Sequence, residues 1–377
     1  MIDRRLLRNL DFPLPVLVIL LMGLGLLLIY SATHSTIADT DPAQYLEHQA
    51  VWVGVGLLVI VALLLVDYVQ LSRWSTLIYA ANLVMLGLVL LVGRTALGAQ
   101  RWLQMGPISL QPSEFAKVGL IITLAATLAR KEGKWRGPLD YLPPLLHVAV
   151  PTVLVVMQPD LGTSLVFLAI LMGMLLVAGA PPLQLLGLTA GGVAAVALAL
   201  YLHFQVGLPI PLKEYQLQRL IVFLHPDVDA LGAGYHLRQS LIAVGSGRWL
   251  GKGLFAGAQS QLEFLPQRHT DFVFSVAAEE LGFLGAFMVL VLYFLVVWRA
   301  VRIGMESKDL FGSLIATGAA SMLAFHILVN VGMTIGIMPI TGIPLPFLSY
   351  GGSALLTNCL LVGLLLSVSM RRRRILF

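Results

Sequence analysis

Charged side chains are scarce in this sequence of 377 residues. They make up 11% of the chain, whereas hydrophobic residues make up 58% and the mean hydropathy is +0.89. A soluble protein is roughly a quarter charged. The composition therefore predicts a polytopic membrane protein, and the net charge of +5 is read as a topology signal and not as a nucleic-acid site.

Metal and nucleotide motifs are missing as well. Cys359 is the only cysteine, which excludes an intrachain disulfide and a thiolate metal cluster. The eight histidines lack the spacing of a zinc site. The glycine-rich segment Gly245 to Gly257 lacks the spacing and the hydroxyl of a P-loop. With Arg248 and Lys252 in it, this segment is either a flexible loop or a backbone site for pyrophosphate.

Apolar runs of spanning length follow one another along the sequence. A transmembrane helix needs about 17 to 25 mostly apolar residues. We expect an all-α polytopic membrane protein with a single domain over residues 1–377 and ten transmembrane helices, an even number that puts both termini on one side. The runs lie at about 14–31, 49–66, 74–92, 113–129, 142–157, 162–179, 183–203, 271–298, 311–337 and 352–370.

Basic residues predict the orientation of these helices, because cytoplasmic loops carry an excess of lysine and arginine. Alternate connections carry 15 of the 24 basic residues, and the first connection on the other side has Asp39, Asp41 and Glu47 with no lysine or arginine. Both termini are therefore expected to be cytoplasmic. The 15 residues are Arg4, Arg5, Arg8, Arg73, Arg130, Lys131, Lys134, Arg136, Arg299, Arg302, Lys308 and Arg371 to Arg374.

This topology places a long polar connection, about residues 204–270, on the extracytoplasmic face between helices seven and eight. Loops of this length are usually functional or carry short helices of their own. Two amphipathic pieces, Tyr215 to Leu224 and Tyr235 to Val244, are predicted to be helical. They either lie at the membrane interface with Arg219 and Arg238 toward lipid phosphates, or pack as lids on the helices beneath.

Asp271 lies where this polar connection gives way to the eighth apolar run. Ionisable groups at or within a membrane are costly and are functional candidates by default. Glu279 and Glu280 follow on the same helix, about 12 to 13 Å deeper at 1.5 Å per residue. The alternative interpretation is that Asp271 only caps this helix, since aspartate is a favoured N-cap residue.

Three more features place polar groups at outer helix ends. Glu114 and Lys117 stand at i and i+3 and are predicted to form an ion pair, functional or structural. Asp160 follows the helix-breaking Pro159 and is expected to cap the sixth helix. The proline- and glycine-rich segment from Met338 to Ser353 predicts irregular backbone that lines a cavity.

Taken together, short motifs of this chain resemble the SEDS family of bacterial cell-wall polymerases. Residues 259–266 look more like the rod-shape branch (RodA) than the division branch (FtsW). One departure is Gln267, where the family pattern has glutamate. The motifs are Gly98-Ala99-Gln100-Arg101-Trp102, Gln111-Pro112-Ser113-Glu114, Gln158-Pro159-Asp160-Leu161-Gly162, Gly232-Ala233-Gly234-Tyr235, His269-Thr270-Asp271-Phe272, Glu279-Glu280-Leu281-Gly282 and Ser349-Tyr350-Gly351-Gly352-Ser353.

The resemblance implies a peptidoglycan glycosyltransferase of the bacterial inner membrane that polymerises lipid II during cell elongation. It also implies a class B penicillin-binding protein as partner, engaged through its transmembrane helix and periplasmic region. The family's essential aspartate falls on Asp271, and its helix-four pair on Glu114 and Lys117. Asp160, His269 and Ser349 belong to the matching motifs and are expected to support the site.

The residues fit this chemistry on their own account. One ionised carboxylate can take the proton of a sugar hydroxyl, which typically contributes about 10² to 10⁴-fold, and Asp271 is the candidate. Cations are needed for the departing pyrophosphate. No acidic cluster specifies a metal, although a divalent ion is compatible with the reaction. The outer basic candidates are Arg101, Lys117, Arg219, Arg238, Arg248, Lys252 and Arg268.

Two other functions compete with the polymerase. A transporter or flippase of a lipid-linked precursor would use Asp160, Glu279 and Glu280 to carry protons or bind cargo, although a repeated-half architecture is not visible. A scaffold would only position other cell-wall enzymes. Lipid II, the nascent glycan, membrane lipids and the penicillin-binding protein are the expected partners, with no nucleic acid.

Overall fold

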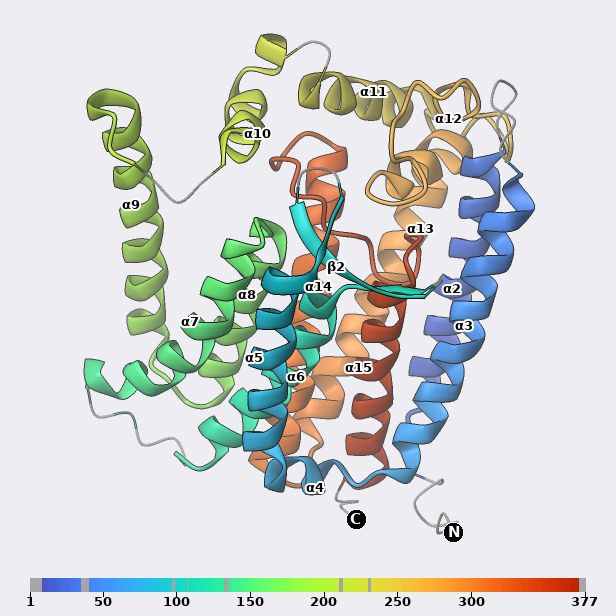
Figure 1. The fold of residues 1–377 in the computed structure, drawn as a ribbon. Coiled ribbons are helices and arrows are strands. Elements are labelled where there is room, and N and C mark those ends of the chain that lie inside the picture. The colour runs from blue at the N-terminus through green and yellow to red at the C-terminus, as the bar shows by residue number, and fades with distance from the viewer. Residues whose placement is uncertain are drawn as a thin grey trace.

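The protein is a bundle of long helices with a layer of short helices across one end (Figure 1). The computed structural model describes residues 9–34, 41–96, 99–106, 108–131, 135, 137–209, 213–229 and 232–372. Its long helices are α2 (Pro13–Thr33), α3 (Pro42–Leu65), α5 (Ser75–Val92), α6 (Pro112–Ala129), α7 (Leu142–Met157), α8 (Leu161–Val177), α9 (Pro182–Val206), α13 (Val273–Met305), α14 (Leu310–Thr334) and α15 (Gly352–Met370).

These ten helices confirm the all-helical polytopic fold class. Within the described ranges, nine of them are long and apolar enough to cross a membrane, and Leu161–Val177 is a shorter apolar helix. The start of α2 and the end of α15 lie together, where Ser369 Oγ donates to the carbonyl of Asn9 over 3.2 Å. Arg4, Arg5, Arg8, Lys134, Arg136, Arg373 and Arg374, which support the predicted orientation, lie outside the described residues.

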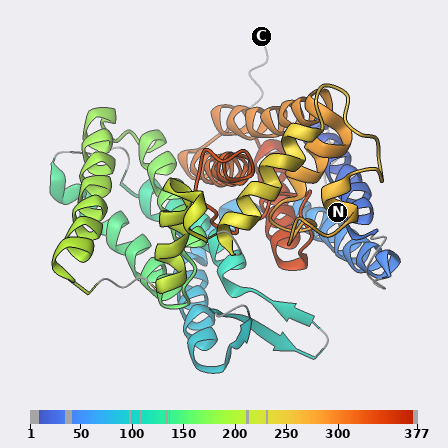
Figure 2. The same ribbon diagram turned by 90° about the horizontal axis from the view of Figure 1, so that it is seen from above.

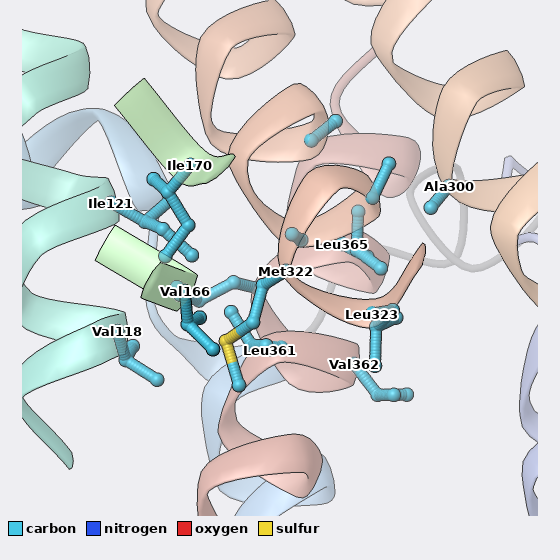
Figure 3. Close-up of a cluster of buried hydrophobic side chains, with 14 of the residues drawn as sticks. Val118, Ile121, Val166, Ile170, Ala300, Met322, Leu323, Leu361, Val362 and Leu365 are labelled. Atoms are coloured by element: carbon cyan, nitrogen blue, oxygen red, sulfur yellow. The ribbon is translucent and has the colours of Figure 1, made fainter. Parts of the chain in front are cut away.

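The core lies where α6, α8, α14 and α15 meet. Of the most apolar 18 residues of α6 and of α15, 83% are buried within the protein, against 6% in α9. Helix α9 stands apart from the core in both views (Figures 1 and 2). Figure 3 shows aliphatic side chains from α6, α8, α13, α14 and α15 meeting there. Cys359 of α15 is fully buried, and a Cβ placed on Gly56 of α3 would lie 2.5 Å from its sulfur.

A small sheet precedes α6, in the connection between the third and fourth apolar runs. Strands β1 (Arg94–Ala96), β2 (Ala99–Met105) and β3 (Ile108–Leu110) pair antiparallel in the order β1-β2-β3. This sheet projects sideways from the bundle in the view of Figure 2. Strands β1 and β3 have three residues each, too few to show alternation, and the sequence of β2, AQRWLQM, does not alternate between apolar and polar residues. The sheet places Arg101 and Trp102 beside the start of α6.

The long connection forms a layer over one end of the bundle, which we call the capped end. It contains α10 (Glu214–Leu224), η2 (Pro226–Asp229), α11 (Ala233–Ser246) and α12 (Ala258–Gln261), so the two predicted amphipathic helices are confirmed. Figures 1 and 2 show α11 lying across the ends of the long helices. The remaining short helices are α4 (Tyr68–Arg73) and η1 (Pro138–Tyr141).

The glycine-rich segment before α12 packs against a break in α13. At Gly282 the backbone of α13 is non-helical, with φ 68° and ψ −169°. The backbone N–H groups of Lys252 and Gly253 donate to the carbonyls of Glu279 and Glu280, and Phe283 N–H donates to Arg248. The segment therefore packs on α13, and the N–H groups of Lys252 and Gly253 are already bonded and do not form a pyrophosphate cradle.

Candidate active site

A cavity of about 560 Å³ opens at the capped end, between the starts of α6, α8 and α15 and the lid formed by α10, η2 and α11. The loop before α13 and the irregular segment 340–344 complete its wall. The prediction that the proline- and glycine-rich segment lines a cavity is therefore confirmed. Six of the predicted site residues line this cavity: Arg101, Glu114, Lys117, Asp160, Arg219 and Asp271.

Asp271 faces this cavity and does not cap a helix. The N-cap of α13 is Phe272, without a side-chain capping bond, so the capping interpretation is wrong. Within the described part of the chain, the carboxylate of Asp271 makes no hydrogen bond. Burial raises the pKa of Asp271 to about 6, and the guanidinium groups of Arg219 and Arg101 counteract part of this rise. A carboxyl group with this pKa is mostly ionised at neutral pH and still basic enough to accept a proton.

The backbone that carries Asp271 is fixed by three consecutive carbonyl groups. The carbonyl of His269 accepts from Tyr350 N–H over 2.9 Å, and that of Thr270 accepts from Ser349 Oγ over 2.6 Å. The carbonyl of Asp271 itself accepts from Asn330 Nδ2 over 2.9 Å. The loop before α13 is therefore tied to the segment before α15 and to α14.

Gly342 leaves room between the carboxylate of Asp271 and the guanidinium of Arg219. A Cβ at this position would lie 3.4 Å from Oδ2 of Asp271 and 3.8 Å from Nη1 of Arg219. The φ of Gly342 is 73°, a conformation that favours glycine. The backbone thus approaches both charged groups closely without filling the space between them.

Glu114 and Lys117 form the predicted ion pair, 2.6 Å apart in the first turns of α6. The two residues are 4% and 1% exposed, respectively. Lys117 Nζ also lies 3.2 Å from Nε2 of His326 on α14. Because an ammonium group only donates, the imidazole nitrogen accepts, and the ring carries its proton on Nδ1. Lys117 therefore lines the cavity with its charge neutralised by Glu114, which lines the same wall.

Removing the carboxylate of this pair is expected to destabilise the protein. The variant Glu114→Gln leaves Lys117 charged and buried, and breaking such a pair costs about 3 to 5 kcal/mol. The thermal unfolding midpoint in detergent should fall clearly. The double variant Glu114→Gln/Lys117→Met removes both charges and should recover most of the loss. A single variant as stable as the parent would contradict this account of the pair.

Asp160 and Arg101 form a second charged pair, and Asp160 also accepts from Ser113 Oγ at the start of α6. Asp160 caps α8 as predicted, since its side chain accepts from the N–H of Thr163. Arg101 Nη1 lies 3.7 Å from Asp160 Oδ1, and the same guanidinium donates to the carbonyls of Gln158 and Pro159. The proline break therefore supplies acceptors that hold Arg101 beside the cavity.

Five predicted supporting residues lie outside the cavity wall. Lys252 pairs with Glu279 over 2.7 Å, and Arg268 pairs with Glu263 over 2.7 Å. Arg238 is exposed on α11.

His269 contacts the rings of Tyr45 and Tyr350, with centroids 5.2 and 5.6 Å away. Burial and the nearby Arg268 lower the pKa of His269 to about 4, so it is neutral at physiological pH. Ser349 holds the loop before α13, as described above.

Other polar residues at the site were not predicted. Gln111, Gln267 and His236 line the cavity, and Asn330 and His326 stand behind it on α14. Burial, followed by Arg219, lowers the pKa of His236. The only sequence signal for Asn330 and His326 was a lone polar residue in an apolar run, which is also typical of a satisfied core residue. Gln267, the departure from the family pattern, faces the cavity and carries no charge there.

Within the described ranges, no group of three histidine, cysteine, aspartate or glutamate side chains is arranged to hold a metal ion. Burial raises the pKa of Asp271 in this cavity, and the cations Arg101, Lys117 and Arg219 line it together with the carboxylates of Glu114, Asp160 and Asp229. This arrangement suits proton abstraction next to a developing anionic charge.

Comparison with known proteins places the chain in a family. Residues 12–374 match the family model described as cell cycle protein, FtsW/RodA/SpoVE. The chain is 36% identical over 367 residues to the peptidoglycan glycosyltransferase MrdB of Escherichia coli K12, covering 95% of this chain and 94% of that protein.

Two solved structures have the same fold. One is a chain from a study of polymerization and crosslinking by a peptidoglycan synthase complex, with a TM-score of 0.78, 35% identity and coverage of 96% of this chain and 97% of that chain. The other is the rod shape determining protein RodA of Thermus thermophilus, with a TM-score of 0.70, 33% identity and coverage of 97% and 98%. The chain therefore belongs to the FtsW/RodA/SpoVE family of polytopic membrane proteins.

Proposed function

We propose that this protein is a peptidoglycan glycosyltransferase that polymerises glycan strands from lipid II during cell elongation. The observation that carries the proposal is the cavity in which Asp271, with a raised pKa, lies near Arg219 and Arg101, with Lys117 in the same wall. Relatives with 95% coverage of this chain are named peptidoglycan glycosyltransferases, which supports the same reaction.

Each of these residues has a role in a single nucleophilic displacement at the anomeric carbon. Asp271 takes the proton of the acceptor sugar's 4-hydroxyl as that oxygen attacks the anomeric carbon of the donor. A new glycosidic C–O bond forms, and the bond to the pyrophosphate oxygen breaks with its electron pair leaving on the polyprenyl pyrophosphate. Arg219, Arg101 and Lys117 stabilise the negative charge that builds there. Attack opposite the leaving group inverts the anomeric centre.

The position of the cavity suits substrates with lipid tails. It opens at the ends of helices that span the bilayer, so a sugar can enter while its polyprenyl chain stays in lipid. We place the capped end on the extracytoplasmic face of the inner membrane, because Arg73 and Lys308 lie in connections at the other end and Arg299 lies in the last turns of α13 there. The partner we propose is a class B penicillin-binding protein, which would crosslink the product.

The transporter alternative loses two of its three carboxylates in the fold. Glu279 pairs with Lys252 and accepts from Gln259 N–H, and Glu280 accepts from Ser31 Oγ over 2.6 Å. Neither lines the cavity. These contacts hold the glycine-rich segment and α12 against α13, and α13 against α2.

A polymerisation assay separates the proposal from its alternatives. Purified protein in detergent, with its penicillin-binding partner and fluorescent lipid II but without ATP or an ion gradient, should form glycan chains resolved on a gel. A flippase or a scaffold forms none under these conditions. An inactive mutant of the partner's transpeptidase site should leave polymerisation intact. Absence of chains with the complete complex would refute the proposed function.

The raised pKa of Asp271 predicts how the rate depends on pH. A base works only when deprotonated, so with a pKa of about 6 the value of kcat/KM should fall as pH drops through 6, about tenfold per unit below it. Above pH 7 the carboxylate is almost fully ionised and this group should cause no further rise. Initial rates between pH 4.5 and 8 measure the curve. A rate that stays constant down to pH 4.5 would exclude Asp271 as the base.

A further inference from the structure

Helix α14 supplies no residue of the cavity wall. Two of its polar side chains nevertheless contact residues that line the cavity, at the carbonyl of Asp271 and the ammonium of Lys117. His326 and Asn330 are spaced one helical turn apart, on the same face of α14. They are 1% and 0% exposed. Burying a polar group on an apolar spanning helix costs free energy unless the group is hydrogen-bonded, and such residues are functional candidates.

Asn330 holds both sides of the cavity wall. Its Nδ2 donates to the carbonyl of Asp271 over 2.9 Å and to the carbonyl of Ile343 over 2.8 Å, so both amide hydrogens are used. One carbonyl belongs to the loop that carries the base, and the other to the segment beside Gly342. The relative position of the carboxylate and of the opposite backbone is therefore set by one side chain.

The origin of this contact distinguishes it from the other two anchors of the loop. Tyr350 and Ser349, which hold the carbonyls of His269 and Thr270, belong to irregular backbone themselves. Asn330 belongs to a regular helix packed in the core. A site is held most accurately when its anchors come from rigid elements.

His326 fixes the ammonium group of Lys117, as Asn330 fixes the backbone of Asp271. Its Nε2 accepts from Lys117 on the side away from the cavity, while Glu114 accepts a second hydrogen. An ammonium group has three donors. Two acceptors fixed in the protein therefore define the direction of the third N–H of Lys117, which lines the cavity.

The unused atoms of both side chains argue against a purely structural role. Within the described residues, Oδ1 of Asn330 and Nδ1 of His326 are buried without a hydrogen-bond partner. Such unsatisfied atoms destabilise the fold, whereas apolar residues of the same size would not carry this cost. What an apolar residue could not provide is the hydrogen bond from Asn330 to Asp271 and that from Lys117 to His326.

We propose that His326 and Asn330 are positioning residues: α14 aligns the ammonium of Lys117 and the backbone of Asp271 relative to each other, without touching the substrate. The proposal rests on the glycosyltransferase function proposed above. It predicts that both residues act on turnover more than on substrate binding, because misplacement of the reacting groups lowers the rate even where affinity is kept.

The test for Asn330 is the variant Asn330→Leu, which has similar volume and no donor. We expect kcat for lipid II polymerisation to fall by about 100-fold, with KM changed by less than about threefold. The matched control is Asn358→Leu on α15, since Asn358 is also buried, has an unpartnered Oδ1 and does not line the cavity. Its kcat should stay close to that of the parent.

The test for His326 compares two replacements. His326→Gln keeps an acceptor within reach of Lys117, whereas His326→Phe keeps a ring but removes the acceptor. We expect the phenylalanine variant to lose kcat by about 10- to 100-fold and the glutamine variant to recover most of it. Thermal unfolding midpoints of all four variants are measured alongside, so that a loss of folding is separated from a loss of turnover.

Each outcome decides one point. If the parent polymerises lipid II and Asn330→Leu keeps kcat within about threefold of it, the positioning role is wrong and the proposed function stands. Equal losses of kcat in Asn330→Leu and Asn358→Leu, or in both His326 variants, would also overturn the positioning role. A parent complex that makes no glycan refutes the function and the positioning role together.

Discussion

Asp271→Asn is expected to abolish glycan synthesis, with a loss of at least about 10² to 10⁴-fold in kcat. The amide has nearly the shape of the carboxylate but cannot accept the proton of the acceptor hydroxyl. Folding should be preserved, because no described side chain bonds to this carboxylate and its backbone carbonyl keeps the bond from Asn330. Burial of a neutral group also costs less than burial of an ionised one.

Glu263→Gln is the matched control for this variant. It makes the same change from carboxylate to amide in the same connection, at an exposed residue that pairs with Arg268 outside the cavity. Its rate should equal that of the parent, and both variants should unfold within a few degrees of it. If folded Asp271→Asn polymerises lipid II within about tenfold of the parent, another group is the base.

Gly282→Ala is expected to destabilise the protein through both backbone strain and a backbone clash. With φ 68° and ψ −169°, Gly282 occupies a region that is essentially restricted to glycine, and a side chain there costs about 1 to 3 kcal/mol. The new Cβ would also lie 2.2 Å from the backbone nitrogen of Gly251. Either the glycine-rich segment separates from α13 or the helix shifts, and the bonds of Lys252 and Gly253 to α13 are lost.

Two alanine variants separate the sources of this effect. Gly253→Ala introduces the strain of φ 98° with open space around it, and should lower stability by about 1 kcal/mol. Gly54→Ala, within α3 and also in open space, should be neutral or slightly stabilising. Thermal unfolding in detergent ranks the three. Gly282→Ala as stable as Gly54→Ala would show that the break in α13 is not required.

The helices were predictable because the bilayer imposes one length and one composition on each of them. The ten runs differ from the observed helices mainly at their ends, as where α13 continues to Met305. The sheet and the break at Gly282 were not predicted. Strands β1 and β3 have too few residues to show alternation, and the seven residues of β2 do not alternate. A glycine in an apolar run looks the same whether the helix continues or breaks.

Some residues of the site could also be identified from the sequence, and others could not. Asp271, Glu114 and Lys117 were identified because charges are rare in this chain, so each one next to an apolar run carries information. The basic residues of the long connection were not separable, since the sequence does not show which cation meets which carboxylate. Lys252 is held by Glu279, whereas Arg219 turns toward Asp271. Only the packing of the lid on the bundle decides between these two outcomes.

The enclosed thiol of Cys359 makes the natural chain suitable for chemical labelling. Its sulfur lies in the helix interface with α3, out of reach of a water-soluble maleimide. A second cysteine introduced at an exposed site such as Arg238 or Leu139 would therefore be the group that reacts. Reagent added to intact cells or to inverted vesicles would then show on which side of the bilayer each end of the bundle lies.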